Sequence, residues 1–156
     1  MAPNRTLTTP LAVAFALATA LSAAPVAAQD YVRAECRPLI GPDPLASDPA
    51  STTARWYRRF WTGNCDGLFG CFGGSPNWNE VVGRLVGRSA PADRAAVLAK
   101  ACRLGPQIGL EWTRPKSLRR IDTGELRRLK STLDAARDVP SGLDRVEAEV
   151  RAKLGR

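Results

Sequence analysis

Four cysteines are the residues of this sequence whose spacing could support the most chemistry. They are Cys36, Cys65, Cys71 and Cys102. A redox pair requires C-x-x-C spacing, in which the pKa of one thiol is lowered, but five residues separate Cys65 from Cys71. A structural zinc site would need all four thiolates, because the sequence contains no histidine, and intervals of 29, 6 and 31 residues lack the usual close ligand pairs. We therefore expect neither redox catalysis nor a bound metal, and no cofactor.

Disulfide bonds are the interpretation that we favour for these cysteines. An even number of cysteines in a short chain with an export signal, described below, is typical of a disulfide framework. Four cysteines allow three pairings, and the sequence does not choose among them. We favour Cys65–Cys71, which the surrounding glycines can close locally, and Cys36–Cys102, which would tie the amino-terminal segment to a helix.

The stretch around the central cysteines, NCDGLFGCFGGSPNWNE at residues 64–80, invites a second functional interpretation. Backbone N–H groups of a glycine-rich turn that leads into a helix can bind an anion. However, the phosphate-binding pattern G-x-x-x-x-G-K-[ST] is absent. We therefore favour a disulfide-closed surface loop with ordinary turn glycines.

Enzymatic mechanisms are limited mainly by the missing histidine. Hydrolases that use an imidazole base are excluded, as are most catalytic zinc sites. A carboxylate mechanism could draw on Asp66, Glu80 or Glu111, although glycosidase chemistry needs two cooperating carboxyl groups. Glu80 lies three residues after Asn77, which favours a capping role, and a salt bridge with an arginine is the plainer role for Glu111. We assign no catalytic residue.

The excess positive charge is concentrated in one segment. Without residues 1–28 the chain has 22 basic and 15 acidic residues, and the stretch 114–130 alone holds seven basic against two acidic ones. Such a run is commonly a solvated surface, but it can also contact phospholipid head groups, envelope polysaccharides or acidic proteins. Nucleic acid ranks low, because the segment lacks interleaved aromatic residues. The predicted anionic-partner patch consists of Arg119, Arg120, Arg127, Arg128 and Lys130.

The first 28 residues have the pattern of a secretory signal peptide. Arg5 is the only charge before the apolar run LAVAFALATALSAA, which is too short for a membrane span, and small residues precede Gln29. We expect cleavage near Ala28. The mature chain should then be periplasmic or secreted and should not be an integral membrane protein. A retained membrane anchor is the alternative. Residues 29–156 then have a length that suits one domain.

Hydrophobic periodicity predicts a mainly α-helical domain of about four to five helices. Residues 51–61 place Trp56, Tyr57, Phe60 and Trp61 on one face, opposite three arginines, which we interpret as a core face rather than a ligand-binding aromatic shelf. A second helix begins after Asn77. A third is expected over 91–104, ended by Gly105 and Pro106.

The remaining segments are less regular. Residues 108–113 alternate apolar and polar side chains, which suggests one short extended segment. Residues 123–154 predict a helical hairpin of two helices, 123–137 and 142–154, with Pro140 in the turn and Ser141 as a cap. Residues 29–50 are expected to be largely extended or loop.

Together these features predict an exported, non-catalytic binding or accessory protein of the bacterial envelope that contacts an anionic or protein partner. The bacterial origin follows from the signal peptide and from the excess of 19 arginines over 4 lysines. A carboxylate-dependent hydrolase of envelope polymers is the alternative.

Overall fold

The computed structural model describes residues 29–63 and 76–155. Asp66, Cys65 and Cys71 are outside these ranges, so the predicted Cys65–Cys71 bond falls outside the described residues. The mainly helical class is confirmed, and no strand occurs in the described ranges. The elements are α1 (Arg37–Ile40), α2 (Thr52–Thr62), α3 (Trp78–Arg88), α4 (Arg94–Trp112), the 3₁₀-helix η1 (Lys116–Leu118), α5 (Thr123–Ala135) and α6 (Val139–Leu154).

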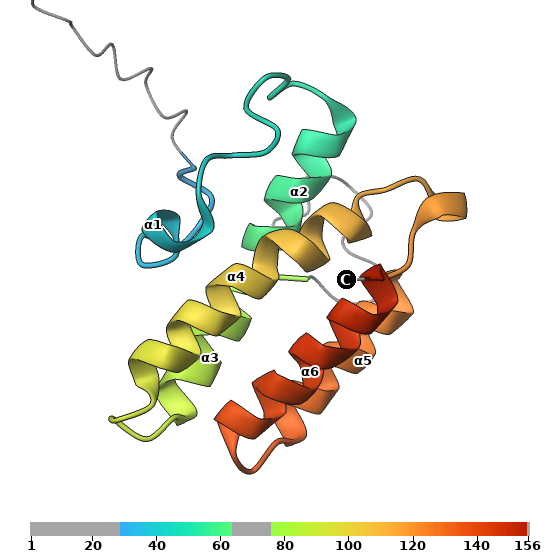
Figure 1. The fold of residues 1–156 in the computed structure, drawn as a ribbon. Helices are drawn as coiled ribbons and strands as arrows, with labels where there is room; N and C mark the ends of the chain where they lie inside the picture. Colours follow the sequence, from blue (N-terminus) through green and yellow to red (C-terminus); the bar gives the residue numbers. More distant parts are fainter. Residues whose placement is uncertain (1–28, 64–75, 156) are drawn as a thin grey trace, which may run out of the picture.

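The helices form two packed pairs, and α2 lies at one end of the molecule (Figure 1). α3 packs against α4, and α5 packs against α6 as the predicted hairpin, with α4 also contacting α6. α2 contacts both α3 and α4, and its inner face joins the same apolar core. None of the described helices is long and apolar enough to cross a membrane.

Side-chain caps determine where most of the helices begin. Ser51 accepts a hydrogen bond from the Ala54 N–H at 3.1 Å, and Asn77 accepts one from the Glu80 N–H at 3.3 Å, as predicted. The predicted cap at Ser141 is wrong. Asp138 caps α6 instead, accepting from the Ser141 N–H at 2.9 Å. Pro140 therefore lies in the first turn of α6, where its missing N–H leaves no helical hydrogen bond unmade.

The long helix α4 differs most from the sequence prediction. It continues through Gly105 and Pro106 to Trp112, so the predicted helix stop and the predicted extended segment at 108–113 are both wrong. The reason is a helical stripe that the alternating pattern concealed. Gly105, Ile108, Gly109 and Trp112 recur at steps of three and four, and all are buried. Packing along this stripe outweighs the cost of a proline inside a helix.

Two glycines of this stripe let the aromatic side chains of α2 approach the α4 backbone. A Cβ at Gly105 would lie 2.3 Å from the Trp61 ring, and one at Gly109 would lie 2.7 Å from the Phe60 ring. Phe60 also stacks on Trp78, with ring centroids 5.6 Å apart. The core at this end of the molecule is therefore an aromatic cluster whose rings pack directly against the α4 backbone at its glycines.

The predicted Cys36–Cys102 disulfide is confirmed. The two sulfur atoms are 2.00 Å apart, and both residues are fully buried. The bond joins the amino-terminal segment to α4. Asn79 of α3 fixes the same segment a second time, because its side chain donates to the Tyr31 carbonyl at 2.7 Å and accepts from the Arg33 N–H at 3.0 Å.

Candidate anion-binding surface

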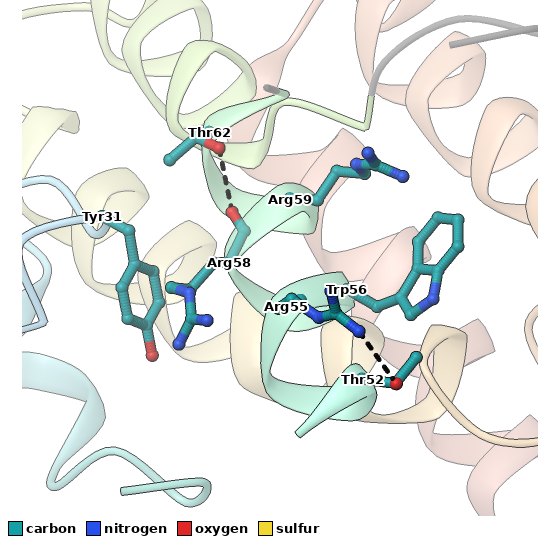
Figure 2. Close-up of a pocket in the computed structure, with 7 residues that line it drawn as sticks. All are labelled: Tyr31, Thr52, Arg55, Trp56, Arg58, Arg59 and Thr62. Carbon is teal, nitrogen blue, oxygen red and sulfur yellow. Dashed lines mark hydrogen bonds between the residues drawn. The ribbon is translucent and has the colours of Figure 1, made fainter. Parts of the chain in front are cut away.

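A hollow of about 540 Å³ lies along the outer face of α2 (Figure 2). We call it the α2 groove. It exists because the helical period turns Tyr57, Phe60 and Trp61 into the core and leaves the intervening residues outside. Tyr31 reaches the groove from the amino-terminal segment. The lining residues are Tyr31, Thr52, Arg55, Trp56, Arg58, Arg59 and Thr62.

Trp56 is the largest exposed apolar side chain of the groove. Sequence periodicity placed it in the core, but 42% of its surface is exposed, so that part of the prediction is wrong. Its position lies at the edge of the buried face, next to Phe60 on the helix. The indole packs edge-on against Trp112, with centroids 5.5 Å apart, and the Arg59 guanidinium lies 4.6 Å from its centroid. These contacts hold the ring in one orientation at the surface.

Two arginines of the groove form no ion pair within the described structure. Arg55 donates to the Thr52 hydroxyl at 3.2 Å, and Arg58 donates to the Pro49 carbonyl at 2.8 Å. Each guanidinium has five N–H donors, so these single bonds leave others directed to solvent. Neither guanidinium therefore forms an ion pair with a carboxylate of the described residues.

Tyr31 closes the groove on the side of Arg58 (Figure 2). Its hydroxyl donates to Asp43 at 2.6 Å. Burial, followed by this bond to a carboxylate, raises the pKa of Tyr31 well above its ordinary value. The phenol therefore stays neutral, and the groove keeps its positive charge at every physiological pH.

The predicted patch is divided between two places. Arg119 donates to the Arg114 carbonyl at 2.8 Å, and Arg120 donates to the Leu154 carbonyl at 2.7 Å, where it covers the carboxyl end of α6. A smaller hollow of about 270 Å³ beside η1 is lined by Arg119 together with Lys116, Asp122, Thr123 and Gly124. These two arginines therefore belong to the loop before α5.

The other three patch residues belong to α5. Arg127 is exposed. Arg128 forms ion pairs with Glu125 at 2.8 Å and with Glu149 of α6. Lys130 is half-buried and donates to the Pro76 carbonyl at 2.9 Å, and burial lowers its pKa. Lys130 is thus less exposed than its position outside the leucine stripe suggested.

Two of the three carboxylates considered for catalysis, Glu80 and Glu111, lie in the described ranges and make structural contacts. Glu80 pairs with Arg84 at 2.6 Å and accepts from the Asn77 side chain at 2.9 Å. Glu111 is buried, accepts from the Arg120 N–H at 2.6 Å and pairs with Arg114 at 3.1 Å, as its predicted salt bridge required. Glu111 therefore fastens the loop that follows α4.

Metal binding finds no support in the described ranges, where no group of three or more candidate ligands is assembled. The α2 groove itself was missed by sequence reasoning. The available signal was the row of arginines at 55, 58 and 59 with a tryptophan on its border. The contribution of Tyr31 had no local signal, because it depends on the disulfide and on Asn79.

Comparisons with known proteins identify no relative. No protein-family model matches the chain, and no curated protein or solved structure is significantly similar to it.

Proposed function

We propose that this chain is an exported, non-catalytic binding or accessory protein of the bacterial envelope that contacts an anionic partner through the α2 groove. The observation that carries the proposal is the pair Arg55 and Arg58, which form no ion pair with a described carboxylate, beside the exposed Trp56. Charge-assisted hydrogen bonds from guanidinium groups to carboxylate or phosphate are among the stronger polar contacts that proteins make.

Export is supported by the disulfide. A fully buried Cys36–Cys102 bond persists in an oxidising compartment and is uncommon in the cytosol. We propose that residues 1–28 are removed near Ala28 and that Cys65 and Cys71 form the second disulfide. Mass spectrometry of the purified mature protein without reduction tests both points. A free thiol, or a link from Cys65 to Cys36 or Cys102, contradicts the second.

The predicted patch remains a second proposed contact surface. Its exposed residues Arg127 and Arg128 lie on α5. Because Arg128 already pairs with Glu125 and Glu149, its charge reversal would also disturb the α5–α6 contact. Neutral replacement of Arg127 by Gln probes this surface while leaving both ion pairs of Arg128 in place.

The proposal is tested by binding to an immobilised anionic polymer at several salt concentrations. The variant Arg55→Gln/Arg58→Gln removes two charges from the groove. Its matched control, Arg103→Gln/Arg137→Gln, removes two charges from exposed side chains that make no hydrogen bond or ion pair with described residues. We expect the groove variant to bind roughly tenfold more weakly and the control less than about twofold. Equal losses of affinity in both variants would mean that binding depends on net charge alone and not on the groove.

The same variants distinguish a specific partner in the native envelope. After cross-linking, a partner that uses the groove should be recovered with wild type and with the Arg103/Arg137 control, and lost with the Arg55/Arg58 variant. Recovery that is identical for all three proteins contradicts the groove as the contact surface. A carboxylate-dependent hydrolase ranks second, because Glu80 and Glu111 are each engaged with an arginine.

A further inference from the structure

The α2 groove combines aromatic rings and arginines in an order that suits a linear ligand. Figure 2 shows Tyr31 beside Arg58 on one side of the helix, Arg55 between, and Trp56 with Arg59 on the other side. Aromatic rings thus lie at both ends of a row of three guanidinium groups. A ligand that crosses the helix would meet a ring, then positive charge, then a ring.

From this arrangement we infer that the groove binds an acidic polysaccharide, a chain of sugars that bear carboxylates. The inference rests on the proposed function and specifies the partner. One face of a sugar ring carries mainly C–H groups and packs on an aromatic ring, which the exposed Trp56 offers. The carboxylate of a uronic acid matches the forked donors of Arg55 and Arg58.

The polar groups of the groove favour a sugar over an acidic peptide. Its polar side-chain groups are guanidinium groups and hydroxyls together with the indole N–H of Trp56, and no carboxylate of the described residues lines it. A sugar chain supplies acceptors almost everywhere, through its hydroxyls, ring oxygens and carboxylates. A peptide also brings backbone N–H donors, which need acceptors, and the side-chain acceptors of the described lining are hydroxyl oxygens, of which that of Thr52 already accepts from Arg55.

A membrane surface fits the groove less well. Interfacial binding requires a broad apolar face that enters the head-group region. Among the described residues, the large apolar side chains with high exposure are Trp56 on α2 and Leu118 on η1. A single indole between arginines matches one sugar ring better than it matches a lipid layer.

The groove is also fixed before the ligand arrives. Trp56 is held by Trp112 and Arg59, and Arg58 is held by the Pro49 carbonyl. Side chains that are already ordered lose less conformational entropy on binding. The affinity for a repeating polymer can therefore come from a few contacts.

The test uses oligogalacturonate as the probe, its methyl ester as the uncharged match, and poly-glutamate as the acidic peptide. Of the four tryptophans, Trp56 is 42% exposed, whereas Trp61 and Trp78 are 0% and Trp112 is 7% exposed. Tryptophan fluorescence therefore reports occupancy of the groove, and calorimetry gives the affinity. We expect oligogalacturonate to bind and to change this fluorescence, with the methyl ester at least about tenfold weaker.

Variants then separate ring stacking from charge. Trp56→Leu keeps apolar bulk against Trp112 but removes the ring face, and it should weaken oligogalacturonate binding by roughly tenfold. Leu118→Ala is the matched control, since it trims the other exposed apolar side chain, and it should bind as wild type does. Circular dichroism and the melting temperature verify that both variants fold. Unchanged binding by folded Trp56→Leu contradicts the inference.

The possible outcomes separate the polysaccharide inference from the proposed function of the groove. If poly-glutamate binds as tightly as oligogalacturonate and Arg55→Gln/Arg58→Gln weakens both, the anionic groove stands and the polysaccharide inference is wrong. If oligogalacturonate fails to bind while a cross-linked envelope protein depends on the groove, the inference is again wrong and the proposed function stands. If neither probe nor envelope partner depends on Arg55 and Arg58, both are wrong.

Discussion

Replacing Gly105 by Ala tests whether the aromatic cluster is seated on the backbone of α4. The added Cβ would lie 2.3 and 2.6 Å from two carbons of the Trp61 ring and 3.0 Å from Trp78. Carbon atoms in favourable contact are about 3.5–4.0 Å apart. Both indoles are completely buried, so neither ring can move away into solvent.

The expected loss is the difference of two opposing terms. Overpacking a well-packed core costs about 1–3 kcal/mol, and the rigid rings place Gly105→Ala at the upper end of that range. Ala is favoured over Gly inside a helix by about 1 kcal/mol. We therefore expect the variant to lose about 2 kcal/mol of unfolding free energy.

Gly87 provides the matched control for this prediction. It lies in α3, is exposed, and a Cβ there would have nothing within 4 Å. Gly87→Ala should therefore gain about 0.5–1 kcal/mol, opposite in sign to Gly105→Ala. Urea unfolding followed by far-ultraviolet circular dichroism measures both. A Gly105→Ala variant as stable as wild type would show that α2 is not seated on α4 as described.

Three further predictions concern stability. Replacing both Cys36 and Cys102 by Ala should remove about 4 kcal/mol in the chain-entropy account, since the bond spans 66 residues; a melting temperature within error of wild type contradicts this. Glu111→Ala should lose about 2–3 kcal/mol in urea unfolding, because the buried carboxylate accepts from the Arg120 N–H, and Glu111→Gln about 1 kcal/mol; equal losses would refute the role of that bond. Burial raises the pKa of Tyr57 to about 12. The unfolded chain therefore loses the phenol proton first, and stability should fall as pH rises from about 10 to about 12, by about 2–3 kcal/mol. Tyr57→Phe should make that fall smaller, with the rest of it due to Tyr31, whose pKa is also raised; an unchanged profile contradicts the assignment.

Features that depend on neighbouring residues were predictable from the sequence. Ser51 and Asn77 begin helices because each side chain reaches an N–H three residues ahead, a relation that the sequence shows directly. The hairpin of α5 and α6 follows from two leucine and valine stripes of helical period. The Cys36–Cys102 bond was a choice among three pairings, and local closure by glycines at Cys65 and Cys71 made it the favoured one.

Features that depend on distant residues were not predictable in the same way. Gly105 followed by Pro106 is a common helix end, but the rings of Trp61 and Trp78, both distant in sequence, make Gly105 a packing site instead. For the same reason, the basic run at 114–130 indicated an excess of positive charge but not which residues its side chains contact. Arg120 and Arg128 both bind residues of α6. No pattern in the sequence shows that α6 lies next to them.

The two faces of α2 are linked by this packing. Trp61 and Phe60 lock the inner face against α4, so the helix cannot rotate about its axis, and the directions of Arg55 and Trp56 on the outer face are fixed as a result. Loosening the inner face should therefore reduce the affinity of the groove before the protein unfolds. Gly105→Ala, measured at a temperature where it remains fully folded, should bind oligogalacturonate less tightly than wild type although it changes no groove residue. Gly87→Ala leaves the contact of α2 with α4 intact and should bind as wild type does. Identical affinities for all three proteins would mean that the groove residues are positioned by contacts other than the packing of α2 against α4.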